Sequence, residues 1–203
     1  MSPSADVSCR IAWGDDAHAM ASVQLASLRS DTPHLLPAEL RGEGAGDAAA
    51  VQELAEIWRG SLTRPADARQ RVLVALERST VRGFALTSPS TDPDADPGDG
   101  ELLDLVVDPA HRREGHGSRL LQAAMDTLAA DRFRRATTWV VTEDDRRRAF
   151  LTAAGWEPDG AHRTLAQGDE ADPVSDSGGD QDGDLGGAAT TRQVRLHVAV
   201  EAP

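Results

Sequence analysis

One stretch of the chain, residues 101–126, combines the residue types that hold an anionic group. It reads ELLDLVVDPAHRREGHGSRLLQAAMD, which is an apolar run, a turn with two glycines, and apolar residues at helical spacing. The first turn of a helix has amide N–H groups without internal partners, and the helix dipole adds partial positive charge there. Glycines let the backbone come close to a ligand, and Arg112 and Arg113 can add charge-assisted contacts. The pattern therefore predicts a phosphate site.

Two common phosphate-binding motifs do not fit this loop. A P-loop requires Gly-Lys-Ser/Thr, and the chain contains no lysine. The dinucleotide fingerprint requires a third glycine, and Leu120 stands at that position. What remains is Arg112-x-x-Gly115-x-Gly117 after a strand that Pro109 ends. For the loop alone, a glycine-containing turn that caps an ordinary helix stays open as an alternative.

The pattern resembles the acetyl-CoA signature of the GNAT N-acetyltransferases, Q/R-x-x-G-x-G/A. A second resemblance lies downstream, where Phe150 and Gly155-Trp156 match the family's N-x-x-A-x-x-F-Y-x-x-x-G-F. Three positions depart from that element: Asp144 stands for Asn, Arg147 for a small residue and Leu151 for Tyr. In many members this Tyr protonates the departing CoA thiolate, so Leu151 leaves the source of that proton open.

The resemblance, over residues 7–200, implies an α/β (α+β) fold in one domain, residues 1–203. A mixed sheet of about seven strands, splayed at an acetyl-CoA cleft, would be flanked by about four helices. Acetyl-CoA is the implied cosubstrate, with no metal, and its pantetheine arm would add to the sheet like an extra strand. The implied cofactor contacts are Val106, Val107, Arg112, Arg113, Glu114, Gly115, His116, Gly117, Ser118 and Asp144.

The acceptor implied by the resemblance is an amine that attacks the thioester directly. A lysine-like amine titrates at about 10.4, so a base or a water relay helps at neutral pH. Glu101 is the first candidate for the base, because some relatives carry a glutamate there, and Asp104 is the second. A solvated carboxylate at a strand end is the alternative for both residues.

Two functions stay open at this point. The first is an active N-acetyltransferase for a small-molecule, peptide or protein amine. The second is an acetyl-CoA-binding regulatory or scaffold domain without transferase activity. Leu151 favours the second, whereas the phosphate loop and Glu101 favour the first.

The rest of the chain predicts the elements around this loop. A loop is expected at 88–100, a capping box of Thr142 with Asp145, and Gly155 as a helix C-cap. Apolar spacing points Phe150, Ala153 and Trp58 inward. Strands are expected at 7–13, 71–87 (two, with a turn at 78–80), 101–107, 134–141 and 191–200, and a short strand around 162–166. Helices are expected from 15 or 16 to 29, at 48–62 and at 143–154.

An acidic segment, residues 167–190, separates the last two predicted strands. It is rich in Asp and Gly and almost devoid of apolar residues, so it is predicted to be a disordered insertion. A calcium loop starting at Asp180 is disfavoured, because Thr191 occupies the position of the closing Glu.

Composition narrows the class of protein. The net charge of −13 argues against nucleic acid and anionic membranes as partners. Cys9 is the single cysteine, which excludes an intrachain disulfide. No signal peptide or membrane-spanning run is apparent, so a cytoplasmic protein is expected. The resemblance adds a possible homodimer.

Overall fold

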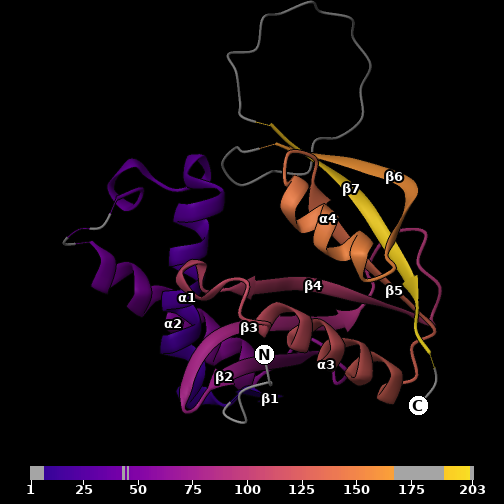
Figure 1. The fold of residues 1–203 in the computed structure, drawn as a ribbon, viewed down its shortest axis with the longest axis horizontal. Coiled ribbons are helices and arrows are strands. Elements are labelled where there is room, and N and C mark those ends of the chain that lie inside the picture. The colour runs from indigo at the N-terminus through magenta and orange to yellow at the C-terminus, as the bar shows by residue number, and fades with distance from the viewer. Residues whose placement is uncertain (1–6, 43, 45, 167–189, 202–203) are drawn as a thin grey trace, which may run out of the picture. The chain divides into compact units, whose positions relative to one another are not determined.

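The computed structural model describes residues 7–42, 44, 46–166 and 190–201. Its seven strands follow the order β1-β2-β3-β4-β5-β7-β6, with four α-helices along the chain, which confirms the predicted fold class (Figure 1). The chain divides into two compact units, Met1–Thr138 with Ala199–Pro203, and Trp139–Val198.

The bounds of most elements agree with the sequence patterns, whereas β6 begins at Glu157 and is longer than the short strand expected around His162. The first unit contains β1 (Val7–Ile11), α1 (Ala17–Asp31), α2 (Asp47–Thr63), β2 (Arg71–Glu77), β3 (Thr80–Pro89), β4 (Asp99–Val107), α3 (His116–Ala130) and the start of β5 (Arg135–Val141). Short 3-10 helices lie at Gly14–Asp16, Pro33–Leu35, Ala38–Leu40 and Pro109–His111. The second unit contains the end of β5, α4 (Asp145–Ala153), β6 (Glu157–Ala166) and β7 (Thr190–Ala199).

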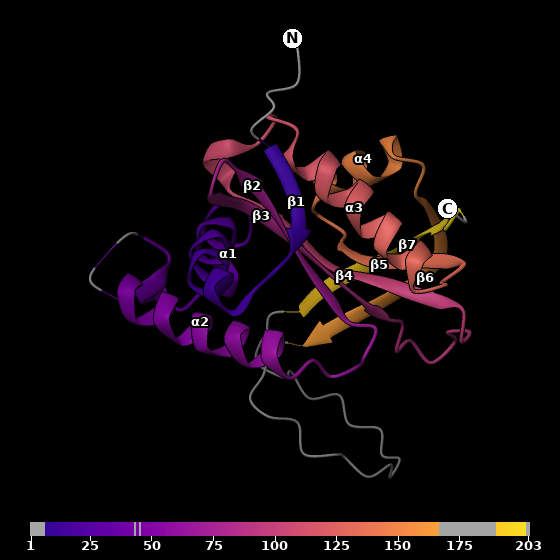
Figure 2. The same cartoon turned by 90° about the horizontal axis from the view of Figure 1, so that it is seen from below.

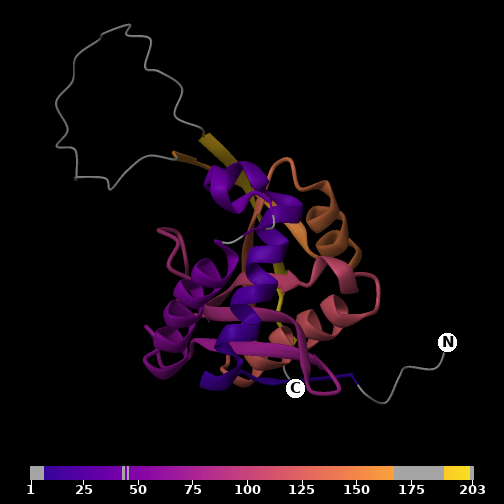
Figure 3. The same ribbon diagram turned by 90° about the vertical axis from the view of Figure 1, so that its left-hand side faces the viewer.

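Helices cover both faces of strands β1–β4 in the first unit. A Cβ built on Gly83 of β3 would lie 3.1 Å from Leu120 Cδ1, so this side of the strand faces α3. The next residue, Phe84, points the opposite way and packs edge-on against Trp58 of α2, with 5.0 Å between ring centroids. Figures 2 and 3 show this layering, with α1 and α2 on one face and α3 on the other.

An apolar core cluster lies on the α1/α2 face of the sheet and includes Trp58. The Trp58 side chain is buried, and its Nε1 donates to Gln24 Oε1 of α1 at 2.7 Å, which satisfies the indole N–H inside the core. Arg29 of α1 reaches Asp47, the first residue of α2, with both terminal nitrogens, at 2.9 and 2.5 Å. These contacts join the two helices and confirm that Trp58 is a core residue.

The predicted loop at 88–100 is shorter than expected. β3 continues to Pro89, which pairs with Gly100 of β4. A Cβ at Gly100 would lie 2.6 Å from Leu128 Cδ2 and 3.0 Å from Phe133 Cγ. Gly100 is therefore a close-packing position beneath α3, and its glycine had wrongly indicated a turn.

The start of α4 differs from the prediction. Asp144 is the N-cap, and its side chain accepts from the backbone N–H of Arg147 at 2.9 Å. The predicted box of Thr142 with Asp145 is wrong, because the Thr142 backbone N–H and hydroxyl both donate to the carbonyl of Arg192 in β7. Because Thr142 is hydrogen-bonded to β7, it does not cap α4.

α4 ends at the glycine that the sequence indicated, but the C-cap is Ala154 and Gly155 is the residue that follows it. Gly155 has a φ of 88°, which a side chain disfavours. Its N–H donates to Thr152 O at 3.0 Å, and the Trp156 N–H donates to Leu151 O at 3.1 Å. Within α4 the buried residue is Leu151, whereas Ala153 is exposed, so the expectation that Ala153 points inward is wrong.

Two sequence predictions stay as predictions. Residues 167–189 of the acidic segment lie outside the described residues, and one domain over 1–203 is not settled by the division into two units. No helix in the described part of the chain is long and apolar enough to cross a membrane.

Asp16 supplies a pH-dependent contribution to stability. Burial raises the pKa of this carboxyl, but hydrogen bonds from Arg10 (2.6 and 2.9 Å) and from the Trp13 N–H (2.7 Å) outweigh that effect and leave the pKa below its ordinary value. A lowered folded-state pKa means that the contribution is present above the unfolded pKa of about 3.9 and is lost as the pH falls through the folded pKa.

We expect Asp16→Asn to lower the free energy of unfolding at pH 7 by about 1–3 kcal/mol, since a charge-assisted network is removed. Urea denaturation from pH 7 to pH 2 measures the difference from the native protein, which should shrink below about pH 4. The matched control is Asp15→Asn, because Asp15 is an exposed neighbour of the same charge. Equal losses in the two variants would contradict the assignment.

Candidate functional site

The predicted phosphate loop joins β4 to α3. After Val107 the chain forms the 3-10 turn Pro109–His111, and α3 begins at His116. Arg119 is the first residue whose backbone N–H donates inside the helix, to Gly115 O at 3.2 Å. The amides of residues 116–118 therefore lie at the open helix end, where an anion can accept from them.

The backbone conformation of the loop favours glycine at position 115. Its φ of 88° lies in the left-handed region, and a Cβ there would lie 2.6 Å from Arg119 Nη1. Arg113 has the same backbone handedness, with a φ of 69°. The guanidinium of Arg119 thus lies over the loop, and sequence reasoning missed it. Its spacing of four residues from Gly115, one helical turn, was the available signal.

Arg112, predicted to contact phosphate, is held by α1 instead. Its terminal nitrogens lie 3.0 and 2.5 Å from the two carboxylate oxygens of Asp31. Nη1 also lies 3.2 Å from Ser30 Oγ, and Nη2 lies 3.4 Å from Ser27 Oγ. This bidentate geometry ties the loop to the C-terminal end of α1. The phosphate contact of Arg112 stays a prediction, and the ion pair leads us to expect that Arg112 positions the loop while Arg113 and Arg119 supply charge for a ligand.

We expect Arg112→Ala and Asp31→Ala to weaken acetyl-CoA binding about three- to tenfold each, the size of effect of a partly exposed ion pair with added hydrogen bonds. The double variant should be no weaker than either single variant, because both changes release the same loop. Calorimetric titration with acetyl-CoA measures the dissociation constants.

The control for this double-mutant comparison is Arg113→Ala. Its loss of acetyl-CoA affinity should add to that of Arg112→Ala. Tighter binding in Asp31→Ala would contradict the positioning role, because it would mean that Asp31 competes with the ligand for Arg112.

The side chains of Glu114 and His116 are turned toward each other. Glu114 Oε2 lies 3.2 Å from His111 Nδ1 and 3.6 Å from His116 Nε2. The His116 ring is 1% exposed, and neither of its nitrogens has a hydrogen-bond partner among the described residues. The cofactor contacts of Glu114, His116 and Ser118 stay predictions, and we expect them to be made chiefly by backbone amides.

The backbone of β4 presents alternate residues to its second edge. The Asp108 N–H donates to Arg82 O of β3 at 2.8 Å, and pairs along this antiparallel ladder alternate between hydrogen-bonded and open. The backbone of Val106, opposite Phe84, therefore pairs with β3. The N–H and C=O groups of Leu105 and Val107 point to the other edge, so of the two predicted valines only Val107 offers its backbone there.

The second edge of β4 pairs with the start of β5. β4 pairs with β5 over Asp99–Glu101 and Arg135–Thr137. At the next position the Thr138 hydroxyl donates to Leu102 O at 2.7 Å, and this side-chain bond ends the contact within the first unit.

A β-bulge in β4 brings the two candidate bases to one face. Thr87 pairs with Leu102 and Leu86 with Asp104, so Leu103 is the additional residue. Without a bulge, positions 101 and 104 would point to opposite faces. With it, both share the α1/α2 face with Val106, and Leu103 is 44% exposed.

Glu101 is 5% exposed and lies inside β4. The alternative of a solvated strand-end carboxylate is therefore wrong for Glu101. Asp104 is half-buried, and its Oδ1 accepts from the Leu105 N–H at 2.8 Å. A buried carboxylate such as that of Glu101 is what we expect of a general base that works in a site with little water.

The remaining predicted residues belong to the second unit. Asp144, predicted to contact the cofactor, caps α4 through the Arg147 N–H. Leu151, at the position of the family's Tyr, is 1% exposed and apolar. Its side chain offers no proton, so this unit lacks the acid that the resemblance would place on α4.

Comparison with known proteins identifies relatives of this architecture. A model of the acetyltransferase (GNAT) family matches residues 34–156. The mycothiol acetyltransferase of Kineococcus radiotolerans is 36% identical over 93 residues, which cover 46% of this chain and 29% of that protein. The matched part thus spans less than a third of this curated relative.

Solved structures share the whole architecture. An N-acetyltransferase from Staphylococcus aureus Mu50 has a TM-score of 0.64 at 15% identity, covering 97% of this chain and 100% of that one. The PaiA N-acetyltransferase of Thermoplasma acidophilum in complex with coenzyme A has a TM-score of 0.63 at 14% identity, covering 95% and 98%. At these identities the likeness shows the fold.

Proposed function

The chain belongs to the GNAT family of acetyltransferases, and on this premise we propose that it moves an acetyl group from acetyl-CoA to an amine. The observation that carries the proposal is the loop before α3. It combines left-handed Gly115, open amides at residues 116–118 and the cations Arg113 and Arg119. This is the chemistry that a pyrophosphate requires.

The pantetheine arm would follow β4. Its amides would pair with the backbone of Leu105 and Val107, whose hydrogen-bonding groups point away from β3. The bulge at Leu103 interrupts this edge at the level of the candidate bases. The reacting thioester would accordingly lie near the bulge, with the pyrophosphate at the loop.

In the reaction the neutral amine forms a bond to the thioester carbonyl carbon, and the bond from that carbon to sulfur breaks. Glu101 would take the proton that the amine loses, with Asp104 as the second candidate. The thiolate leaves as an anion or takes a proton from water, since an ordinary thiol titrates at about 8.5. Much of the rate would come from holding the two reactants together.

A second candidate function rests on Leu151. A buried apolar residue at the family's Tyr position is what a domain that binds acetyl-CoA for regulation, without transfer, would tolerate. The buried carboxylate of Glu101 favours the enzyme, because an idle domain has no reason to bury an acid on β4.

Calorimetric titration with acetyl-CoA, with free CoA as control, tests the cofactor. A panel of small amines, peptides and protein amines, read out as acceptor-dependent CoA release, tests the transfer. Binding together with release supports the enzyme. Tight binding without release across the panel supports the regulatory domain, and a folded protein that binds neither form of CoA would overturn both.

A further inference from the structure

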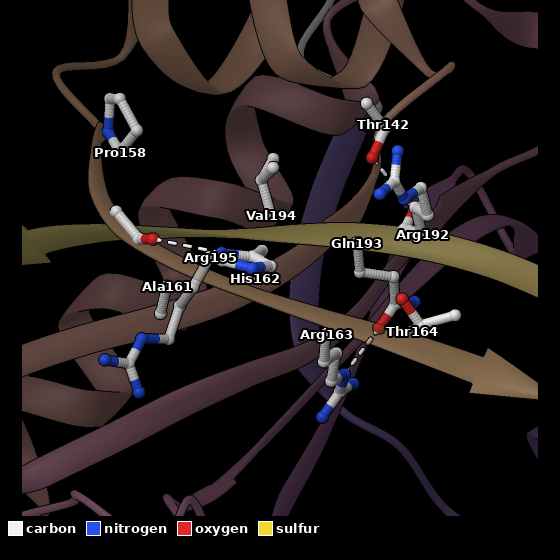
Figure 4. A pocket seen from close by; sticks show the side chains of 11 residues that line it. Thr142, Pro158, Ala161, His162, Arg163, Thr164, Arg192, Gln193, Val194 and Arg195 are labelled. Atoms are coloured by element: carbon white, nitrogen blue, oxygen red, sulfur yellow. Dashed lines mark hydrogen bonds between the residues drawn. The ribbon is translucent and has the colours of Figure 1, made fainter. Parts of the chain in front are cut away.

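A cavity of about 350 Å³ lies against β6 and β7 in the second unit, and its lining includes Arg163 and Arg192 (Figure 4). The two arginines stand at successive positions of the β6–β7 ladder. Their side chains therefore point to opposite faces of the strand pair and cannot share one ligand. Ionisable side chains that do face one another lie instead in the loop before α3, where Glu114 stands between His111 and His116.

The histidine cluster, which we define as His111, Glu114 and His116, is built around one carboxylate oxygen. Glu114 Oε2 lies 3.2 Å from His111 Nδ1 and 3.6 Å from His116 Nε2. The other ring nitrogen of His111, Nε2, lies 3.9 Å from Asp108 Oδ2. A proton added to His111 would therefore have a carboxylate on each side of the ring.

His116 is the buried member of the histidine cluster. It is 1% exposed, and neither ring nitrogen has a hydrogen-bond partner among the described residues. As the first residue of α3 it lies at the positive end of the helix dipole, which disfavours a further positive charge there. A neutral ring still has one N–H to donate, and Glu114 Oε2 is the carboxylate oxygen within 4 Å of it.

Charged groups from the neighbouring elements are held by partners of their own. Arg82 of β3 lies 3.0 Å from Glu77 Oε2 and 3.9 Å from Asp108 Oδ2. Asp31 of α1 forms the ion pair with Arg112. The ionic partners of Glu114 in the described ranges are the two histidines, so the balance of its charge depends on whether a histidine is protonated.

An anion at the open end of α3 would change this balance. The amides of residues 116–118, where the pyrophosphate is proposed to bind, begin two residues after Glu114. Bound pyrophosphate would thus place more negative charge beside a carboxylate and two imidazoles. Negative charge within about 4–6 Å favours the protonated form of a histidine, and histidine ordinarily changes its charge between about pH 5 and pH 8.

We propose that acetyl-CoA binding is coupled to the uptake of one proton by the histidine cluster, with His111 as the residue that gains it. The proton comes from the solvent and makes both ring nitrogens of His111 donors, one toward Glu114 and one toward Asp108. The inference rests on the proposed function, because the anion is the pyrophosphate of acetyl-CoA. Since the bound state holds more protons than the free state, the affinity falls as the pH rises.

Calorimetric titration in two buffers with different enthalpies of ionisation measures the number of protons taken up per ligand bound. The ligand is 3′-dephospho-CoA, which keeps the pyrophosphate but lacks the phosphate monoester that itself titrates at about pH 6. At about pH 7 we expect the native protein to take up about half a proton and His111→Asn less than about a tenth. The native affinity should fall about three- to tenfold between about pH 6 and pH 8.

Glu114→Gln separates an effect of charge from an effect on the structure of the loop. It removes a negative charge beside the pyrophosphate, so at about pH 8 we expect binding about three- to tenfold tighter than that of the native protein. A glutamate that only held the loop in shape would weaken binding when replaced. The matched control is His18→Asn, because His18 is an exposed histidine of α1, and it should take up protons as the native protein does.

Three results would overturn the coupling while leaving the proposed function intact. They are binding by the native protein without proton uptake, weaker binding by Glu114→Gln at about pH 8, and equal proton uptake by His111→Asn and His18→Asn. A native protein that binds no form of CoA would overturn the proposed function, and the coupling with it.

Discussion

Gly117→Trp should abolish acetyl-CoA binding, by more than about a hundredfold, while the fold is kept. Gly117 is the second residue of α3, and its amide is one of those left open at the helix end. An indole there would fill the space that a pyrophosphate needs. A hundredfold loss corresponds to about 2.7 kcal/mol, within reach of the several hydrogen bonds to a charged group that would be lost.

A substitution at position 117 tests acetyl-CoA binding with less effect on folding than a substitution at position 115. Gly115 has a positive φ, so any side chain strains the loop, whereas Gly117 is not among the positive-φ glycines and a side chain fits its helical backbone. The matched control is Gly60→Trp, since Gly60 is exposed, lies in α2, and has nothing within 4 Å of a built Cβ. Calorimetry on both variants, with circular dichroism for the fold, makes the comparison. Normal binding by Gly117→Trp would place the cofactor elsewhere.

Glu101→Gln should lower kcat by about 10²- to 10⁴-fold, the range for loss of a general base. Glutamine has nearly the same shape, so the buried position on β4 keeps its packing and acetyl-CoA should bind with unchanged affinity. The defect should shrink as the pH rises toward about 10, because the amine then loses its proton without help. Steady-state kinetics across pH, with an acceptor from the amine panel, measures both effects.

Asp104→Asn is the matched control, because the bulge places Asp104 on the same face of β4 and the same charge is removed. We expect a loss below tenfold for this variant. If Asp104→Asn lowered kcat strongly and Glu101→Gln changed it little, Asp104 would be the general base in place of Glu101. A pH-independent defect in Glu101→Gln would show that the residue supports structure and does not take the proton.

The strand–loop–helix around residues 101–128 was predictable from sequence because its determinants are local. A proline ends the strand, glycine allows the left-handed turn at position 115, and buried Leu120, Leu121, Ala124 and Leu128 recur at helical spacing. The same holds for Gly155 at the end of α4. Each of these features depends on residues that are close together in the chain, so residue types and their spacing are enough to predict it.

Other assignments failed where a distant residue decides. Thr142 and Asp144 are both good caps by sequence, and the carbonyl of Arg192, 50 residues away, takes Thr142. The ion pair of Arg112 with Asp31, 81 residues away, likewise could not be read from the sequence. Gly100 indicated a loop, although it serves to let Leu128 and Phe133 approach the strand.

The sequence by itself determined the family resemblance, the order of elements, the phosphate loop and the acidic residues that could act as a base. Only the tertiary structure decided which of these residues act together. The bulge at Leu103 puts Glu101 and Asp104 on one face of β4, and Asp31 of α1 binds Arg112 of the loop. The physical reason is that register, bulges and competition for hydrogen-bond partners depend on what is opposite in space, which residue type and spacing do not encode.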